Sequence, residues 1–136
     1  MKLFIVTITI AIFIFSCNND TTKRPTTALD TGRDFIRATL DGDFKNAESL
    51  LCQDSLNMEI FKAYERSFSN YSTQKKDAYK AANIIVNNFE EVNDSTSILN
   101  YSNSYMKQAQ KIKLQKIDKV WQVDFKYTTG DSTSNK

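Results

Sequence analysis

Val120-Trp121-Gln122-Val123-Asp124-Phe125-Lys126-Tyr127 is the stretch that decides the fold. Its apolar residues recur at every second position, which is the period of a β-strand with one buried face. The alternation predicts that four side chains point into the core: Trp121, Val123, Phe125 and Tyr127. It predicts that Asp124 lies on the opposite, solvent-exposed (wet) face. Three earlier stretches share the β-branched and aromatic composition and are joined by short polar turns: 83–93, 96–106 and 111–117. The sequence therefore predicts a four-stranded antiparallel meander with one wet face.

The first of these stretches departs from strict alternation. Its apolar phase slips between Val86 and Phe89. A slip of this kind indicates one extra residue in the strand, which is a β-bulge. Asp94-Ser95 then predicts the turn into the second strand.

The residues before the meander follow the period of a helix instead. Thr27 begins a start that resembles a capping box, and Gly42 and Asp43 end the first helix and cap a second. Asp54 caps a third helix, whose aromatic residues recur at spacings of three and four: Phe61, Tyr64, Phe68 and Tyr71. A stripe at this spacing is typical of a buried helix face. With a short fourth helix over 73–81, these helices are predicted to cover the dry face of the sheet.

The first seventeen residues carry the pattern of an export signal. Lys2 precedes an apolar run over 3–15, which is followed by Ser16 and Cys17. As a helix the run would rise about 20 Å, which is short for a hydrocarbon core about 30 Å thick and typical of a signal peptide. Residues 14–17 resemble the lipobox of bacterial lipoproteins. The second of these residues is not the usual small one, as in the looser boxes of the Bacteroidetes type.

This resemblance implies that the signal peptide 1–16 is removed and that the sulfur of Cys17 receives a diacylglycerol. Two or three acyl chains would then hold the protein at a membrane. We expect residues 17–26 to form a flexible tether, 27–127 the folded domain and 128–136 a polar tail. Because Asn18 rather than Asp follows the cysteine, the resemblance implies the outer membrane of a bacterial envelope, on either of its faces.

Composition narrows the chemistry that the domain can perform. The chain has no histidine, and its formal net charge is +2. The absence of histidine removes the commonest general base and metal ligand. The net charge is too small to indicate a surface that binds nucleic acid. We therefore expect neither a metal nor a cofactor. With Cys17 assigned to lipid, Cys52 has no disulfide partner, and we expect it to be a buried thiol.

Two motifs resemble a known superfamily. One is the start of the domain over 32–44, in which Asp41-Gly42-Asp43 separates two helices, and the other is the strand segment 121–124. Together they resemble the small cone-shaped, cystatin-like α+β domains of the nuclear transport factor 2 superfamily, over roughly 27–127. The resemblance implies a curved sheet, and it does not imply one activity, because the superfamily includes isomerases, dehydratases and binding domains.

Enzymes of that superfamily carry an Asp or a His–Asp pair inside the cone. This chain lacks histidine, and Asp124 is predicted on the wet face, so we expect no enzyme. The candidate ligand contacts are aromatic residues of the meander: Tyr101, Tyr105, Trp121 and Tyr127. Core packing with the hydroxyls at the rim would account for the tyrosines equally.

We expect a non-catalytic, membrane-anchored module that binds a small ligand, an envelope polymer or a partner protein. An isomerase-like or dehydratase-like enzyme and a periplasmic inhibitor or immunity protein stay open as alternatives. The tripeptide Asp-Ser/Thr-x also occurs four times and resembles the acceptor of O-glycosylation in Bacteroidetes-type envelopes, with these acceptor residues: Thr21, Ser55, Ser95 and Ser132. Asp and Ser are also favoured in turns and caps, so both interpretations stay open.

Overall fold

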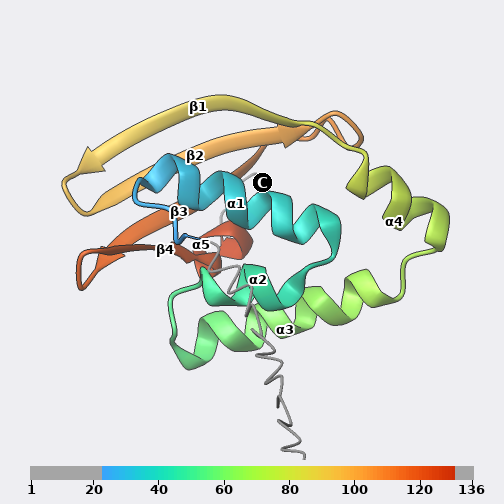
Figure 1. Ribbon diagram of the computed structural model, residues 1–136, viewed down its shortest axis with the longest axis horizontal. Coiled ribbons are helices and arrows are strands. Elements are labelled where there is room, and N and C mark those ends of the chain that lie inside the picture. The colour runs from blue at the N-terminus through green and yellow to red at the C-terminus, as the bar shows by residue number, and fades with distance from the viewer. Residues whose placement is uncertain (1–22, 131–136) are drawn as a thin grey trace, which may run out of the picture.

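A computed structural model describes residues 23–130 of the chain. It contains, in chain order, α1 (Ala28–Asp41), α2 (Phe44–Ser49), α3 (Ser55–Ser69), α4 (Thr73–Lys80), β1 (Ile84–Asn93), β2 (Thr96–Asn103), β3 (Gln110–Ile117), β4 (Val120–Asp124) and α5 (Phe125–Gly130). Within this range, helices α1 to α4 precede a four-stranded sheet (Figure 1). The order of elements confirms the predicted α+β class.

The strands pair in chain order as an antiparallel meander, β1-β2-β3-β4. In the turn between β3 and β4, Asp118 and Lys119 have φ of 50° and 66°, which is the conformation of a two-residue hairpin turn of type I′. The outer edge of β4 is covered, because the Val123 N–H donates to the Leu50 carbonyl (2.8 Å) and the Cys52 N–H donates to the Val123 carbonyl (2.9 Å). β1 forms the opposite edge of the sheet.

The predicted bulge in β1 is confirmed. Val86 pairs with Tyr101 and Phe89 pairs with Leu99, so between these pairs two residues of β1 lie opposite one residue of β2. The extra residue brings both Val86 and Phe89 to the sheet face that Leu99 shares. This is the physical cause of the phase slip in the sequence.

Side chains cap three helices at the predicted starts: Thr27, Asp43 and Asp54. Each accepts a hydrogen bond from the backbone N–H three residues further on, at 3.1, 3.1 and 3.0 Å. These bonds satisfy donors that the first turn of a helix leaves unpaired. Gly42 ends α1 with φ of 76°, a left-handed conformation that favours glycine.

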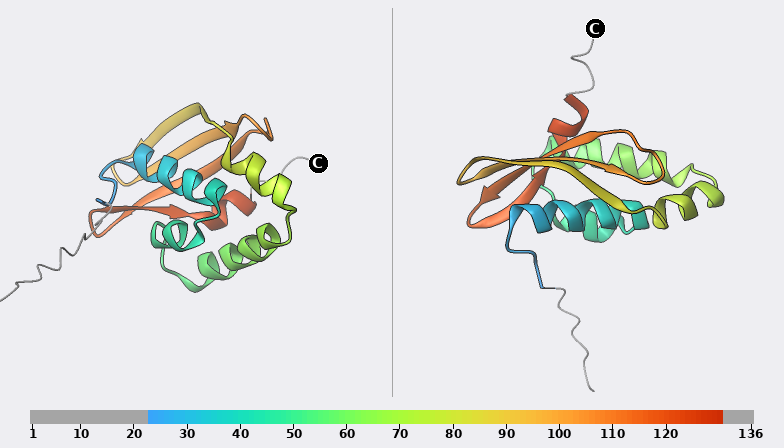
Figure 2. Two further views of the ribbon diagram at one scale, coloured as in Figure 1. Left: turned by 45° about the vertical axis from the view of Figure 1, so that its right-hand side comes forward. Right: turned by 90° about the horizontal axis from the view of Figure 1, so that it is seen from above.

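Helix α1 lies against one face of the sheet with α2 beside it, and α3 lies at the side of the molecule away from β1 (Figures 1 and 2). Helix α1 approaches the sheet closely at Gly32, where an added Cβ would lie 2.7 Å from Cδ2 of Leu99. Glycine at this position therefore sets how near the helix can lie. The core beneath it consists of large, fully buried apolar side chains from all layers: Phe35, Ile36, Leu51, Phe61, Leu99, Ile112, Leu114 and Val123.

The prediction that the last strand continues to Tyr127 is wrong. The strand β4 ends at Asp124, and α5 begins at Phe125. The ring of Phe125 packs in the helical core, with its centroid 5.5 Å from that of Phe61. The Lys126 N–H donates to the side-chain oxygen of Asn57 on α3 (3.0 Å). These contacts turn the chain away from the sheet. The alternation in the sequence could not show them, because they depend on α3.

Asp124 is also not on a wet face. Strand alternation does place it opposite Val123, but its side chain is only 11% exposed. Its carboxylate lies 3.8 Å from Nζ of Lys113 and 3.7 Å from Nζ of Lys126. The two cations offset the cost of burying the carboxylate. The prediction fails because α5 supplies Lys126 where the sequence pattern indicated more strand.

Both ends of the domain adjoin residues that the structure does not describe. The predicted signal peptide 1–16 and Cys17 lie outside the described residues, as does 131–136 of the predicted tail. Of the predicted tether, 23–26 is described, and the Arg24 guanidinium donates to the Ser49 carbonyl (3.1 Å). No helix within 23–130 has the length and apolar character that crossing a bilayer requires.

Candidate functional site

A cavity of about 240 Å³ lies among α1, α3, α4, α5 and the sheet. We call it the tyrosine cavity, because four of its lining residues are tyrosines: Tyr64, Tyr71, Tyr79 and Tyr101. Apolar side chains complete its walls: Phe35, Ile36, Leu40, Met106 and Phe125. Four uncharged polar residues also line it: Thr39, Asn103, Gln110 and Thr128.

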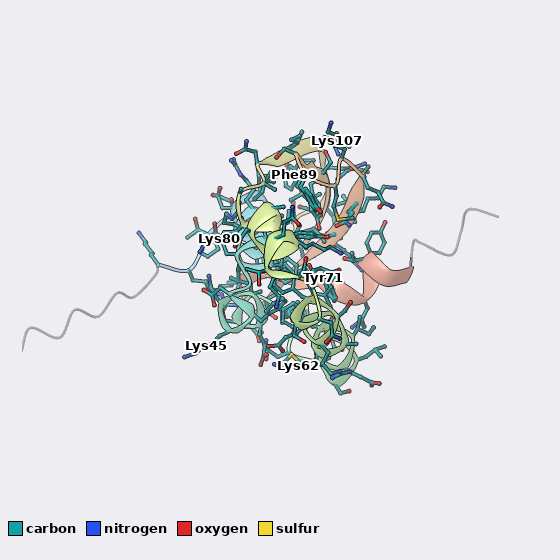
Figure 3. The ribbon with its side chains drawn as sticks, turned by 90° about the vertical axis from the view of Figure 1, so that its right-hand side faces the viewer. Lys45, Lys62, Tyr71, Lys80, Phe89 and Lys107 are labelled. Atoms are coloured by element: carbon teal, nitrogen blue, oxygen red, sulfur yellow. The ribbon has the colours of Figure 1, made fainter. Side chains whose placement is uncertain are left out.

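The helices α3 and α4 position three of the tyrosines. Tyr64 lies on α3, Tyr71 lies in the connection that follows α3, and Tyr79 lies on α4 with its ring centroid 5.7 Å from that of Tyr71. Figure 3 faces this end of the molecule and shows Tyr71 between the two helices. Nζ of Lys75 stands 3.4 Å from the centroid of the Tyr71 ring, so a cation–π contact holds the ring at the outer side of the cavity.

The tyrosine hydroxyls are engaged within the fold. Tyr101 donates to Oε1 of Gln110 (2.7 Å) and Tyr79 donates to the sulfur of Met106 (2.6 Å). Tyr64 is hydrogen-bonded to Thr39, and Tyr71 to Tyr79. The rings are therefore fixed in place, and they present mainly their apolar surfaces to the cavity.

The cavity carries no charge at neutral pH. Burial raises the pKa of Tyr64 and Tyr101 well above the usual value for a tyrosine. Burial, with a smaller contribution from Tyr71, raises the pKa of Tyr79 to about 12. None of the residues that line the cavity is acidic or basic. A charged molecule inside it would lose hydration and meet no countercharge among the lining residues.

One residue of the lining has a hydroxyl without a hydrogen-bond partner. Among the described residues, two buried side-chain oxygens lack a hydrogen bond, Oδ1 of Asp124 and Oγ1 of Thr128. The Asp124 oxygen is near the ammonium group of Lys126, whereas Thr128 lines the tyrosine cavity. A buried hydroxyl without a partner costs about 1–3 kcal/mol. Because this oxygen of Thr128 is buried, it does not form part of the surface that the cavity presents to a ligand.

No family model, curated protein or solved structure matches the chain. The resemblances to lipoproteins and to the nuclear transport factor 2 superfamily therefore stay predictions. The candidate site rests on the geometry of this chain alone.

Of the predicted ligand contacts, Tyr101 lines the tyrosine cavity and the other three do not. Tyr105 lies in the loop after β2 and is 47% exposed. Tyr127 is half-buried on α5. Trp121 is half-buried on β4, with Nζ of Lys116 5.7 Å from its ring centroid. The structure therefore does not bring the four residues to one site, and the incorrect end of the last strand explains this for Tyr127.

Sequence reasoning missed most of the cavity. The sequence pattern placed Tyr64 and Tyr71 in a buried stripe and gave Tyr79 no role. It placed Thr128 at the start of the polar tail, whereas the structure places Thr128 on α5. A signal was present in the stripe, because Phe61 and Phe68 are buried whereas the two tyrosines are half-buried. Within this stripe, tyrosine in place of phenylalanine marked the two positions that border the cavity.

The structure describes two of the four predicted glycosylation sites. Ser55 is exposed as the first residue of α3. Ser95 is exposed in the turn between β1 and β2, where its N–H and hydroxyl donate to Oδ1 of Asn93 at 3.0 and 3.1 Å. Thr21 and Ser132 lie outside the described residues. Glycosylation stays a prediction for all four.

A second polar cluster joins α3 to α5. Oδ2 of Asp54 accepts hydrogen bonds from Nζ of Lys126 (2.8 Å) and Nδ2 of Asn57 (2.6 Å). The bond from Lys126, followed by the one from the Asn57 N–H, lowers the pKa of Asp54 to about 2. Burial, followed by the nearby carboxylates of Asp124 and Asp54, raises the pKa of Cys52 to about 11. Cys52 is thus a buried thiol, as predicted, and the cluster secures α5 against the domain.

A larger hollow of about 430 Å³ lies beside α1 and has charged walls. Its Arg37 is already bound within the fold. The guanidinium donates to both carboxylate oxygens of Asp41 (3.0 and 2.8 Å) and to the carbonyls of Lys80 and Ala82. Within the described range, no three His, Cys, Asp or Glu residues are grouped as metal ligands would be. The tyrosine cavity is therefore the stronger candidate for a binding site.

Proposed function

We propose that the protein is a non-catalytic binding module, held at a bacterial envelope membrane through lipid on Cys17, and that the tyrosine cavity takes a small uncharged molecule. The observation that carries the proposal is a volume of about 240 Å³ with aromatic walls and no acidic or basic side chain. Small-molecule sites in proteins share this character, because they are concave and mostly apolar with a few fixed polar groups.

The way the walls are held supports a preformed site. The hydroxyl of Tyr101 is fixed by Gln110, and that of Tyr79 by Met106. Rings that are fixed before a ligand arrives lose little conformational freedom when it binds. A cavity with these walls can therefore bind a small molecule without rearrangement of the domain.

The lining favours binding over the dehydratase-like and isomerase-like alternatives. Such an enzyme would use a carboxylate that faces the cavity and whose pKa is raised by burial. The buried carboxylate of Asp124 instead lies near Lys113 and Lys126, and it does not belong to the lining. A role as an inhibitor or immunity protein remains the alternative that capture of a specific protein partner would favour.

The proposed placement depends on residues 14–17, which resemble a lipobox. Expression of the full chain in a Gram-negative host with labelled palmitate tests it directly. We expect label on the wild-type protein in the membrane fraction and none on the Cys17→Ser variant. Unlabelled wild-type protein that is soluble, or that keeps residues 1–16, would contradict the lipid anchor. It would not bear on the proposal that the cavity binds a ligand.

Binding is tested with toluene, using amide chemical shifts of the full chain in detergent. We expect shifts at lining residues such as Tyr101. Thr39→Met places a larger side chain in the cavity and should abolish these shifts. Thr73→Met makes the same change at an exposed position on α4 and should preserve them. Absence of toluene binding to the wild type, or equal binding to both variants, would contradict the proposed site.

A further inference from the structure

The end of the molecule that carries α4 is basic. We define this basic end as residues 73–86 and 104–107, which include α4, the start of β1 and part of the loop after β2. The two segments lie side by side, because the Asn83 N–H donates to Oγ of Ser104 (2.9 Å) and the Ser104 N–H donates to the Asn83 carbonyl (2.9 Å). They contain four lysines and one acidic residue, a net charge of +3 that exceeds the +2 of the whole chain. The lysines are Lys75, Lys76, Lys80 and Lys107, and Figure 3 faces this end.

The lysine charges are not neutralised within the described part of the chain. Nζ of Lys75 lies 3.4 Å from the centroid of the Tyr71 ring. Nζ of Lys76 donates to the Ser69 carbonyl (2.8 Å). Neither partner is charged, and none of the four lysines forms an ion pair with another described residue.

The nearby carboxylates do not cancel this charge. Asp77 is the one acidic residue of the basic end. Asp41 and Glu65 border Lys76 and Lys80 in a hollow between the helices. Each is already paired, Asp41 with an arginine of α1 (2.8 Å) and Glu65 with a lysine of α3 (3.0 Å). The basic end therefore offers net positive charge to an anionic partner.

Exposed apolar side chains lie among these lysines. Seven large apolar side chains are exposed in the described range, and the basic end carries four of them: Ile85, Val86, Tyr105 and Met106. Their exposed fractions lie between 38% and 47%. Apolar and aromatic side chains mixed with lysines suit the headgroup region of a bilayer, where the apolar parts are covered and the ammonium groups stay in water. A soluble polyanion would leave the apolar side chains exposed.

The tether leaves the domain within reach of this end. Lys23, the first described residue, lines the same hollow as Arg37. The guanidinium of Arg37 in turn donates to the carbonyls of Lys80 (3.0 Å) and Ala82 (2.8 Å). Cys17 precedes Lys23 by six residues, which span at most about 20 Å when extended. A lipid on Cys17 would therefore hold the basic end close to a bilayer surface.

From these features we propose that the basic end docks on an anionic bilayer surface, and that docking turns the Met106 side of the tyrosine cavity toward the lipid. Met106 belongs both to the lining of the cavity and to the exposed surface. This inference rests on the proposed anchor and cavity, and it adds the orientation of the domain and the source of the ligand. Uncharged apolar molecules concentrate in a bilayer, so the docked cavity takes its ligand from there.

Paramagnetic relaxation in lipid nanodiscs tests the docking. The full chain is held in discs of phosphatidylcholine, with or without phosphatidylglycerol, that carry a nitroxide on some headgroups. Each lysine near an anionic surface strengthens association about fivefold. We expect the amides of Lys80 and Met106 to relax at least about fivefold faster in the anionic discs than in the neutral ones. The amide of Leu56, at the end of α3 far from α4, should change little, and about 1 M salt should remove the difference.

Charge reversal tests the lysines against a control of equal charge. Lys80→Glu combined with Lys107→Glu should weaken docking at least about tenfold. Lys45→Glu combined with Lys119→Glu makes the same change at exposed positions outside the basic end and should weaken it less than about threefold.

One apolar position of the basic end has a matched control on the same strand. Ile85→Asn should weaken docking about threefold, because apolar surface no longer enters the headgroup region. Val92→Asn, at an exposed position toward the other end of β1, should not weaken it.

Several results would overturn the docking. They are equal relaxation in anionic and neutral discs, and equal losses in the two double variants. Shifts of the same amides with soluble polyglutamate, without contact to the discs, would assign the basic end to an acidic protein segment instead.

The docking and the proposed function fail separately. If palmitate labelling fails, the same discs are added to the soluble protein and the same amides are read, so the docking is still tested. Labelled protein that binds toluene but shows no contact between the basic end and anionic discs would refute the docking alone.

Discussion

Gly32→Ala tests how closely α1 lies against the sheet. Two effects oppose each other. Alanine favours the helix by about 1 kcal/mol relative to glycine. Against this, the added Cβ would lie 2.7 Å from Cδ2 of Leu99, 3.4 Å from Cδ2 of Leu114 and 3.5 Å from Cδ1 of Ile112. All three neighbours are fully buried, so they have little room to move.

Overpacking of a well-packed core costs about 1–3 kcal/mol. After the gain in helix propensity, we expect Gly32→Ala to lower the free energy of unfolding by about 1 kcal/mol. For a domain of this size that corresponds to a fall in Tm of about 4–8 °C. Urea denaturation followed by circular dichroism and by the fluorescence of Trp121 measures the change.

Two further variants make the result specific. Ser67→Ala lies at an exposed position of α3, gains helix propensity without a contact, and should be neutral or slightly stabilising. Leu99→Ala alone should cost about 2–5 kcal/mol. The double variant with Gly32→Ala should lose about 1 kcal/mol less than the sum of the two single variants. Leu99→Ala removes the Cδ2 atom that the added Cβ would overlap. A stabilised Gly32→Ala variant, or additive effects in the pair, would refute the close approach.

Two other predictions concern the cluster at the start of α3. Asp54→Ala should lower the free energy of unfolding by about 1 kcal/mol at pH 7, because a helix cap is lost. In urea titrations this difference should shrink below about pH 4, since the folded pKa of Asp54 is about 2 and the unfolded pKa is about 3.9. Cys52, whose pKa is raised to about 11, should react with maleimide at pH 8 only as fast as the domain opens.

A specific result would contradict each of these two predictions. A deficit in Asp54→Ala that persists unchanged from pH 7 to pH 2 would mean that the ionised carboxylate is not what stabilises α3. Labelling is read in a Cys17→Ser background, so that only Cys52 responds. Rapid labelling of the native protein would place Cys52 at the surface.

The helices and turns could be predicted because their signals are local. Thr27, Asp43 and Asp54 each bond within their own first turn, and Gly42 adopts a conformation that few other residues tolerate. The bulge between Val86 and Phe89 was visible because it shifts the apolar phase of the strand itself. In each case the determining contacts lie a few residues apart or follow directly from the alternation.

The end of β4 could not be predicted, because distant residues decide it. Asn57 and Asp54 on α3 bind Lys126 and thereby turn the chain into α5. The cavity was missed for the same reason. Phe35 on α1 and Phe125 on α5 come from opposite ends of the domain's sequence, and only the packed helices and sheet bring them to one lining.

The most direct test of the central claim is a crystal structure of the protein grown with 4-methylphenol. We expect one ring inside the tyrosine cavity, among Tyr64, Tyr79 and Tyr101. An empty cavity at saturating 4-methylphenol, with the ring bound at another surface, would contradict it.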